Sequence, residues 1–428
     1  MTQRILIRAG RPPHDTTSNE AALAWGKGVG HFAGNSGNML FCDAVYVALN
    51  TPETAINHDC YDYQSRIVFS PFEVAKLNKS YDAYVLPMAN SFRPSFKRNL
   101  DAYTSLISRL KMKVVVTGVG AQLPLSGSFD SLSWDHKMSI KAFVRAVLNR
   151  SASIGVRGEI TKSLLMKLGF PENSIDVIGC PSVFSTSRDH TVSKTAASID
   201  DSSALGICTN PFRIKNKNDL GMFFSENEKA YPGIVLILQK NYEAEYIIWG
   251  KNLPYSIKGV PSTVLSKTYL EGRMRFFTNS ITWQEYMQTL DFFFGPRLHG
   301  CIAAINAGTP AFFLTIDSRT QELADYHGFP SAHFNKVMAG KSYLARDLYE
   351  AADFSAFNKK MPENWDRYYA FLEKNGLEHI HMEGKANPEY KAKILSAKRP
   401  AGAKPIASLS AKETASRMKW LWQDDKGK

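Results

Sequence analysis

The alternation of short β-rich runs with helical segments constrains the fold of this chain most strongly. In the first half, strand-favouring runs occur at residues 4–7, 66–69, 83–86, 113–117, 152–156 and 175–178. Between them, apolar residues repeat near the helical period of 3.6, as at Leu164, Leu165 and Leu168. Strands that alternate with helices form βαβ units, and such units predict a mostly parallel sheet.

A polar segment divides this pattern into two. Residues 185–203 are rich in Ser, Thr and Asp, which is typical of a linker. Beyond it, the alternation resumes with strands expected at residues 204–209, 233–238, 274–277, 291–294 and 311–316. A chain of 428 residues also exceeds what one core usually serves. We therefore predict α/β domains at residues 1–184 and 204–342, both Rossmann-like and facing a cleft, followed by a helical, basic region at 343–428.

The composition excludes several classes of protein. The five cysteines are dispersed, without a Cys-x-x-Cys pair or histidines at metal-ligand spacing, which argues against a disulfide framework and structural zinc. No apolar run approaches the roughly 20 residues that span a bilayer. The apolar run at the N-terminus is too short for a secretory signal. We therefore expect a cytoplasmic protein that needs no metal.

The net charge of +12 is concentrated at one end of the chain. From Lys385 to Lys428 there are eleven Lys and Arg residues against four Asp and Glu residues. Such a tail can bind an anionic partner or can simply be solvated. No nucleic-acid-binding motif accompanies the charge, so we expect no nucleic acid partner. A helix expected at residues 408–422 could lie on an anionic membrane surface or pack back on the protein.

The most informative motif follows the strand at residues 291–294. That strand runs into Gly295 and a proline, and then Arg297 and His299 stand on the first residues of an Ala-rich helix. Free backbone N–H groups at a helix start already favour an anion. In a parallel sheet this place is also the ligand crevice, outside the carboxyl ends of the strands. The motif therefore predicts a site for a small phosphate- or carboxylate-bearing molecule, with a proton donor beside it.

Other predicted strand ends supply further candidates. Two glycine-containing loops allow the backbone to approach a ligand closely. Their candidate binding residues are Asn35, Gly37, Asn38, Gly118, Gly120 and Gln122. The second loop lacks the third glycine and the acid of a dinucleotide fingerprint, so NAD binding is not expected.

Arginine recurs at these strand-to-helix junctions. Arg157 is followed by Glu159, and Arg319 is preceded by Asp317. The planar fork of arginine suits bidentate binding of carboxylate or phosphate. A histidine beside such an anion would hold its proton more firmly and could act as a general acid.

Together these pieces make the chain resemble the polysaccharide pyruvyl transferase family. The resemblance spans roughly residues 30–330 and rests on four ordered pieces. They are the Gly-Asn-Ser-Gly loop at 34–37, the Gly-x-Gly at 118–120, Val156-Arg157 with the later Leu168-Gly169, and Gly-Pro-Arg-Leu-His-Gly at 295–300 with Asp-Ser-Arg at 317–319. The Arg-Leu-His piece, with Gly-Thr-Pro at 308–310, is the most specific.

The resemblance implies a GT-B-like fold and a specific reaction. Phosphoenolpyruvate would donate pyruvate as a cyclic ketal to two hydroxyls of a saccharide, in the biosynthesis of exopolysaccharide or another cell-surface glycan. Arg157, Arg297, Arg319 and Gly300 would bind the donor, and His299 would be the catalytic acid. No organic cofactor is implied. The acceptor would be a lipid-linked or nucleotide-linked saccharide at the cytoplasmic face of the membrane.

The chain departs from the family pattern at three places, and these leave the general base open. Asn38 stands where the family often has aspartate, and Cys180-Pro-Ser stands where many relatives carry Asp-Pro. The acid usually found directly after the arginine is absent, and Glu159 comes two residues later. Glu159 and Asp317 are the candidates for the base. The alternatives are a GT-B glycosyltransferase that uses a nucleotide sugar, and a non-catalytic saccharide-binding component of an export assembly.

Overall fold

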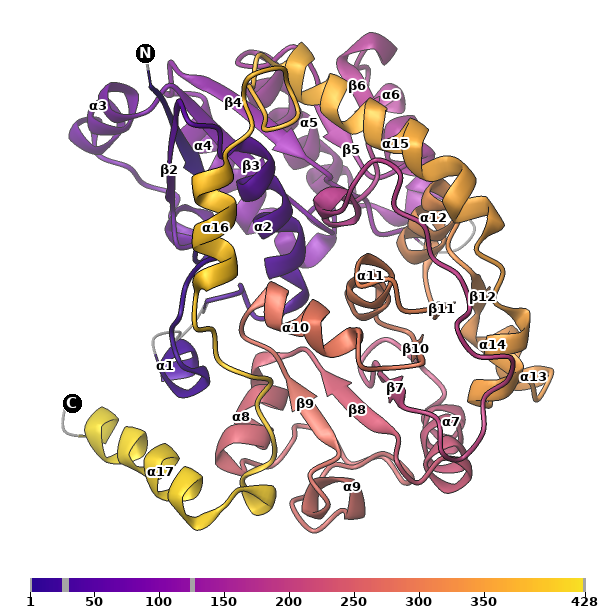
Figure 1. Cartoon of the computed structure of the whole chain (residues 1–428). Coiled ribbons are helices and arrows are strands. Elements are labelled where there is room, and N and C mark those ends of the chain that lie inside the picture. Colours follow the sequence, from indigo (N-terminus) through magenta and orange to yellow (C-terminus); the bar gives the residue numbers. More distant parts are fainter. Residues whose placement is uncertain (1, 25–30, 124–127, 426–428) are drawn as a thin grey trace.

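The computed structural model describes residues 2–24, 31–123 and 128–425, and contains two main parallel sheets (Figure 1). The first sheet has the order β2-β1-β3-β4. Its strands are β1 (Gln3–Ile7), β2 (Thr54–His58), β3 (Ala83–Pro87) and β4 (Lys113–Thr117). A short parallel pair continues it, with a parallel bridge between Val119 and Val156. This pair consists of β5 (Ile154–Val156) and β6 (Ile175–Val177).

The second sheet has six strands in the order β12-β11-β10-β7-β8-β9. Its strands are β7 (Leu205–Ile207), β8 (Val235–Leu238), β9 (Met274–Phe276), β10 (Phe292–Gly295), β11 (Ala311–Thr315) and β12 (Ser331–His333). The strand order reverses between β1 and β3 in the first sheet, and between β7 and β10 in the second. These two switch points are where open parallel sheets bind ligands.

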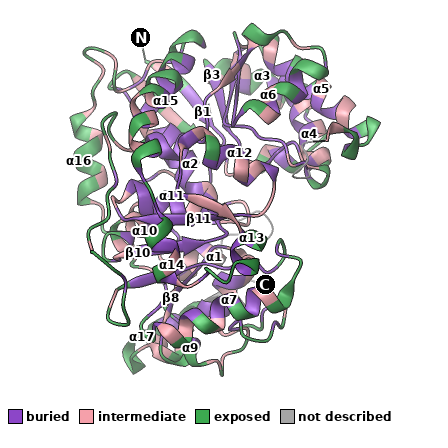
Figure 2. Cartoon of the chain, turned by 90° about the vertical axis from the view of Figure 1, so that its right-hand side faces the viewer, coloured by how far each residue is buried: buried purple, intermediate pink, exposed green. Residues whose placement is uncertain are grey.

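Helices cover both faces of each sheet, so the strands are mostly buried, apart from the edge strands β2 and β12, while the outer helical faces are exposed (Figure 2). The first half contains α1 (Asn19–Ala24), α2 (Gly37–Leu49), α3 (Pro71–Ser80), α4 (Lys97–Ile107), α5 (Trp134–Leu148) and α6 (Glu159–Lys167). The second contains α7 (Lys217–Ala230), α8 (Asn241–Trp249), α9 (Lys267–Leu270), α10 (Ser280–Met287), α11 (Leu298–Asn306), α12 (Ser318–His327) and α13 (Phe334–Ala339). The α/β class with two doubly wound sheets is confirmed.

The C-terminal region is helical and packs on both halves. It contains α14 (Ala345–Ala351), α15 (Ser355–Lys374), α16 (Pro388–Ser396) and α17 (Ala411–Asp425). At the end of α15, Asn375 Oδ1 accepts hydrogen bonds from the backbone N–H groups of Ala152 and Ser153. The helix α17 packs back on the protein, because Arg417 is buried and lies 3.0 Å from Glu20. One side of this helix therefore packs on the protein, and binding of its exposed side to a membrane stays a prediction.

One predicted strand is wrong. Residues 66–69 form neither strand nor helix, and Val68 is 82% exposed. Only Phe69 of this apolar run is buried, so the run anchors a loop instead of entering the sheet. The true edge strand is β2, and neither β2 nor the short β12 is among the strands expected from the sequence. Edge strands bury only one face and carry a weak apolar pattern, as the alternating burial of β2 shows.

Candidate active site

A cleft of about 820 Å³ lies between the carboxyl ends of the two sheets. Six cationic side chains line it, each from the segment that follows a different strand: Arg8, Arg93, Arg213, Lys240, Arg297 and Arg319. Among the described residues, no Asp or Glu lines this cleft. Concentrated charge of one sign between low-dielectric walls raises the local concentration of the opposite ion. The cleft is therefore built for an anion.

Arg157 lies beneath this cleft and is fully buried. Its Nε donates to the carbonyl oxygen of Gly118 at 2.7 Å, and its Nη2 lies 3.5 Å from the carbonyl oxygen of Met88. Its Nη1 is buried without a partner among the described residues. Burial first, and then the nearby Arg319, lower the pKa of Arg157. A buried guanidinium with an unpaired arm is costly unless an anion completes it.

His299 stands on the first turn of α11, close to Arg157. Its ring centre is 5.6 Å from that of Phe41, whose ring also lies 5.8 Å from the Arg157 guanidinium. Its Nε2 is 3.9 Å from Cys180 Sγ. Burial, and then Arg157 and Arg319, hold the pKa of His299 well below 6.5. This environment favours the neutral form of the imidazole.

Gly37 leaves the space that His299 occupies. A Cβ on Gly37 would lie 2.6 Å from His299 Nδ1, which is closer than real Cβ atoms approach. We expect Gly37→Ala to turn the imidazole and to lower the rate of catalysis by about 10- to 10²-fold, since small misplacements of a catalytic group are costly. The matched control is Gly233→Ala, because a Cβ there meets nothing within 4 Å. Steady-state kinetics test this prediction, and equal rates for the two variants would contradict it.

Arg297 is at the switch point of the second sheet and is already partly engaged. It pairs with the buried carboxylate of Glu243, and its Nε donates to the carbonyl oxygen of Thr209. Glu243 also accepts from the backbone N–H groups of Gln239 and Lys240, both at 2.8 Å. The guanidinium lines the cleft but offers a ligand only the donors that these bonds leave.

Asp317 and Arg319 flank the start of α12. Asp317 is the N-cap and accepts from the backbone N–H of Thr320 at 2.9 Å, while Arg319 Nη2 lies 3.5 Å from its Oδ2. Burial opposes ionisation of Asp317, but Arg319 and the bonds to Thr320 outweigh it and lower the pKa. The carboxylate lines a neighbouring cavity of about 560 Å³, which shares Arg213 with the cleft. A low pKa makes it a weak base.

The structure does not bring Glu159 into the site, which corrects the expectation of a base there. Glu159 is exposed on the first residue of α6 and does not line the cleft. The carboxylate that reaches this helix start is Glu322 of α12, which accepts from the backbone N–H of Thr161 at 2.8 Å. Burial raises the pKa of Glu322 to about 7. The direction of a first-turn side chain depends on the packing of the helix, which the sequence pattern did not reveal.

The first glycine-containing loop lies on the wall of the cleft. Asn35 and Asn38 both line it. Asn35 Oδ1 accepts from the backbone N–H of Gly37 at 2.9 Å, and Asn38 Nδ2 donates to the carbonyl oxygen of Phe32 at 3.0 Å. Next to them, the backbone N–H of Ser36 donates to the carbonyl oxygen of Gln239 at 2.8 Å. The loop therefore joins the two halves beside the site.

The second loop supports Arg157. Gly118 has φ +70° and presents its carbonyl oxygen to Arg157, and a Cβ on Gly120 would lie 3.1 Å from Arg157 Cδ. Gln122 Oε1 accepts from Asn90 Nδ2 at 2.6 Å and from Arg213 Nη2 at 3.1 Å. Gly300 has a packing role in the structure, since a Cβ there would lie 2.8 Å from the ring of Phe293.

Four of the six cations that line the cleft were not predicted. Arg8, Arg93, Arg213 and Lys240 carry no motif of their own. Arg8 is buried at the switch point of the first sheet, where its Nη1 donates to the carbonyl oxygen of Pro87 at 2.9 Å. The signal that could have found Arg8 and Lys240 is their position directly after a strand. Arg297 also follows a strand closely, but it was predicted because the residues around it, Gly-Pro-Arg-Leu-His-Gly at 295–300, form a recognisable motif.

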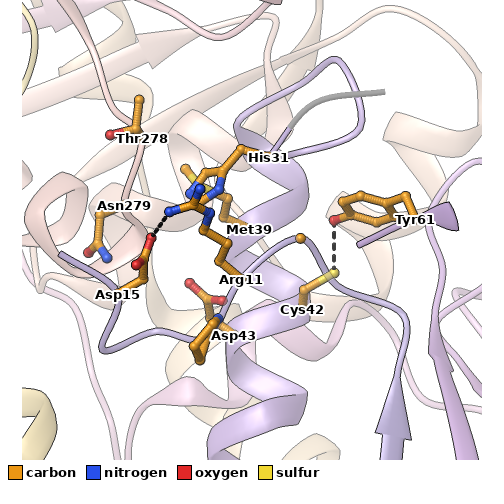
Figure 3. Close-up of a pocket in the computed structure, with 11 residues that line it drawn as sticks. Arg11, Asp15, His31, Met39, Cys42, Asp43, Tyr61, Thr278 and Asn279 are labelled. Atoms are coloured by element: carbon orange, nitrogen blue, oxygen red, sulfur yellow. Dashed lines mark hydrogen bonds and ion pairs between the residues drawn. The ribbon is translucent and has the colours of Figure 1, made fainter. Parts of the chain in front are cut away.

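A small cavity of about 10 Å³ lies where α2 meets the segment after β9 (Figure 3). Asp43 accepts a hydrogen bond from Ser280 across the two halves, and Arg11 pairs with Asp15 at 2.9 Å. Burial raises the pKa of Asp43 to about 7. The space suits about one water molecule and is too small for a substrate. Throughout the described part of the chain, no three His, Cys, Asp or Glu side chains are grouped to hold a metal ion.

A family model described as polysaccharide pyruvyl transferase matches residues 35–318. No curated protein matches the chain significantly. Among solved structures, the chain is similar to UDP-GlcNAc 2-epimerase from Methanocaldococcus jannaschii, at 14% identity over 87% of this chain and 100% of that one, with a TM-score of 0.45. It is also similar to UDP-GlcNAc 2-epimerase from Neisseria meningitidis, at 12% identity over 87% of this chain and 100% of that one, with a TM-score of 0.43.

Proposed function

Since the chain belongs to the polysaccharide pyruvyl transferase family, we propose that it moves pyruvate from phosphoenolpyruvate onto two hydroxyls of a saccharide, as a cyclic ketal. The observation that carries the proposal is that His299 and the fully buried Arg157, whose Nη1 has no partner among the described residues, both lie against the ring of Phe41, beside a cleft that no described carboxylate lines. Phosphoenolpyruvate has a carboxylate and a phosphate, so it can satisfy several cations at once. Arg157, Arg297 and Arg319 would hold these two groups.

The proposed reaction has two steps. In the first, one acceptor hydroxyl adds to C2 of phosphoenolpyruvate, C3 gains a proton from His299, and the hydroxyl loses its proton. In the second, the C2–O bond to phosphate breaks, the second hydroxyl closes the ring at C2 and gives its proton back to the imidazole of His299, and inorganic phosphate leaves. Arginine side chains and helix N-termini would stabilise the departing phosphate. Because no carboxylate of the described chain lines the cleft, the donor's own phosphate would accept the proton of the first hydroxyl.

The neutral imidazole must gain its proton when the donor binds. A bound anion would offset Arg157 and Arg319, and would raise the pKa of His299 from well below 6.5. Binding should therefore take up a proton near neutral pH, and affinity should fall as pH rises through the pKa of the complex. Calorimetric titration of phosphoenolpyruvate in two buffers of different ionisation enthalpy measures this uptake. His299→Gln should abolish it; an unchanged uptake would assign the proton to the phosphate of the donor.

The place of this reaction in the cell is a further part of the proposal. None of the described helices is both long and apolar enough to cross a membrane. The helix α16 exposes Lys391 and Leu395, which is 71% exposed, Lys398 is exposed just after this helix, and α17 exposes Lys419 and Trp420. Basic and apolar side chains on one surface suit an anionic bilayer. We therefore propose peripheral binding at the inner membrane face, next to a lipid-linked acceptor of a cell-surface glycan.

The membrane proposal is tested by sedimentation with phosphatidylserine vesicles. The double variant Lys391→Gln with Lys398→Gln should lose several-fold in partition, because each basic residue near an anionic surface contributes about 1 kcal/mol. The control is Lys76→Gln with Lys111→Gln, two exposed lysines of the first half. Equal partition of the two double variants would contradict the assignment of the surface.

The reaction is tested by release of inorganic phosphate from phosphoenolpyruvate in the presence of candidate saccharides. The proposal predicts release that depends on a saccharide. Turnover of a nucleotide sugar without any use of phosphoenolpyruvate would establish a glycosyltransferase in its place. Saccharide binding without turnover of either donor would indicate a non-catalytic component of an export assembly.

A further inference from the structure

The cleft holds more positive charge than the proposed donor needs. Arg93 donates to Ser95 Oγ at 3.0 Å and to the carbonyl oxygen of Asn90, and Arg213 donates to Gln122 Oε1 at 3.1 Å. All of these acceptors are neutral. Lys240 also lines the cleft, and the carboxylate of Glu243, which already pairs with Arg297, acts on it electrostatically. These three cations line the cleft but belong to neither the Arg157–His299 pair nor the Arg297–Glu243 pair.

The cations of the cleft form two groups according to which charges act on one another, and Arg319 belongs to both. Arg157 and Arg319 are the charges that lower the pKa of His299. After burial, Arg297, Arg93 and Arg213 help to lower the pKa of Lys240 to about 8. After burial, Arg319, Arg213 and Arg8 help to lower the pKa of Arg93 to about 10. Arg93 follows β3 and Lys240 follows β8, so both halves of the protein contribute to the second group.

An aromatic surface lies beside this second group. Phe212 and Tyr242 both line the cleft, and their ring centres are 5.7 Å apart. Tyr255 packs edge-on against both, at 5.9 Å and 6.4 Å. Although it makes these ring contacts, Phe212 is 59% exposed, and such exposure is unusual for a large apolar side chain. Exposed rings at the edge of a polar cleft offer a flat face to a ligand ring.

We propose that Arg93, Arg213 and Lys240 form a second anion subsite, and that Phe212 and Tyr242 hold the sugar ring of the acceptor next to it. The acceptor is then an acidic saccharide, with a phosphate or a carboxylate within about one sugar residue of the hydroxyls that receive pyruvate. This assignment rests on the proposed function. The volume of about 820 Å³ supports it, because this lies in the upper part of the range of roughly 300–1,000 Å³ typical of ligand pockets, and phosphoenolpyruvate alone would leave much of it unfilled.

The subsite is tested by calorimetry on the full chain saturated with phosphoenolpyruvate. Inorganic pyrophosphate and glucuronate are the probes, and the tighter of the two identifies phosphate or carboxylate as the anionic group. Lys240→Met should weaken binding of that probe by about 10-fold or more, as expected for a lost charge-assisted hydrogen bond. The control is Lys251→Met, whose lysine pairs with Glu245 on the surface at the other end of α8. Binding of the probes only in competition with phosphoenolpyruvate would overturn the second subsite.

The proposed contact of the aromatic surface with the sugar ring is tested separately. Phe212→Ala should raise the KM for the saccharide acceptor several-fold and leave the affinity for pyrophosphate and the KM for phosphoenolpyruvate unchanged. Equal turnover of neutral and acidic acceptors by the wild type, with no effect of Lys240→Met, would overturn the acidic acceptor. If phosphoenolpyruvate itself fails to bind, the proposed function fails. The anion subsite is then judged by the dependence of pyrophosphate binding on Lys240 alone.

Discussion

Replacement of His299 by alanine should lower kcat for pyruvate transfer by about 10²–10⁴-fold, the usual contribution of a general acid. His299 lines the cleft and lies close enough to the buried Arg157 for that guanidinium to lower its pKa. Binding of phosphoenolpyruvate should remain close to that of the wild type, because the arginines that hold it are intact. Steady-state kinetics and calorimetric titration of the donor measure the two effects separately.

Two further variants sharpen this result. His299→Gln keeps a polar side chain of similar size but cannot deliver a proton as imidazolium does, so it should be nearly as inactive. His381→Ala is the control, since His381 is exposed on the C-terminal segment and packs on Trp365. If His299→Ala retained more than a tenth of the wild-type kcat, His299 could not be the acid that protonates C3.

Replacement of Arg157 by methionine should have the second-largest effect. Loss of charge-assisted hydrogen bonds to the donor should cost about 3 kcal/mol or more, which is at least about 10²-fold in kcat/KM for phosphoenolpyruvate. The free energy of unfolding without ligand should stay the same or increase, because an apolar side chain replaces a buried cation that has no anionic hydrogen-bond partner. The rise in Tm that phosphoenolpyruvate causes in the wild type should disappear.

Together, these outcomes distinguish a donor-binding role of Arg157 from a purely structural one. A merely structural arginine would lose stability on replacement and would keep its affinity for the donor. Arg367→Met serves as the control, because Arg367 is 56% exposed in a surface pair with Glu363. A large loss of stability in Arg157→Met, with an unchanged response of Tm to phosphoenolpyruvate, would contradict the proposed role.

The alternation of strands and helices was enough to predict the class of fold, because apolar periodicity reports directly which faces are buried. Strand order is different, since it depends on pairing between distant segments. The reversal between β7 and β10, which brings Thr209 to the side chain of Arg297, has no local signal in the sequence. The error at residues 66–69 has the same origin, because an apolar run does not specify whether it has a neighbouring strand.

Only some residues of the site could be predicted from the sequence. Arg297, His299 and Arg319 were predicted from their place at strand ends, and the structure puts all three on the cleft. Arg93 and Lys240 reach the same cleft only because two separate sheets face each other there. Glu159 was placed in the site by its nearness in sequence to Arg157, yet α6 turns it to the surface. The roles of the cleft residues in binding and catalysis stay predictions.

The central claim is that the chain attaches pyruvate from phosphoenolpyruvate to a saccharide as a ketal. Mass spectrometry of acceptor glycans, incubated with the protein and with phosphoenolpyruvate labelled with carbon-13, tests this most directly. The account predicts an acceptor that gains one labelled pyruvate, held through two oxygens, with release of one phosphate. Consumption of a nucleotide sugar and addition of a hexose to the same glycans, with no incorporation of label, would contradict it.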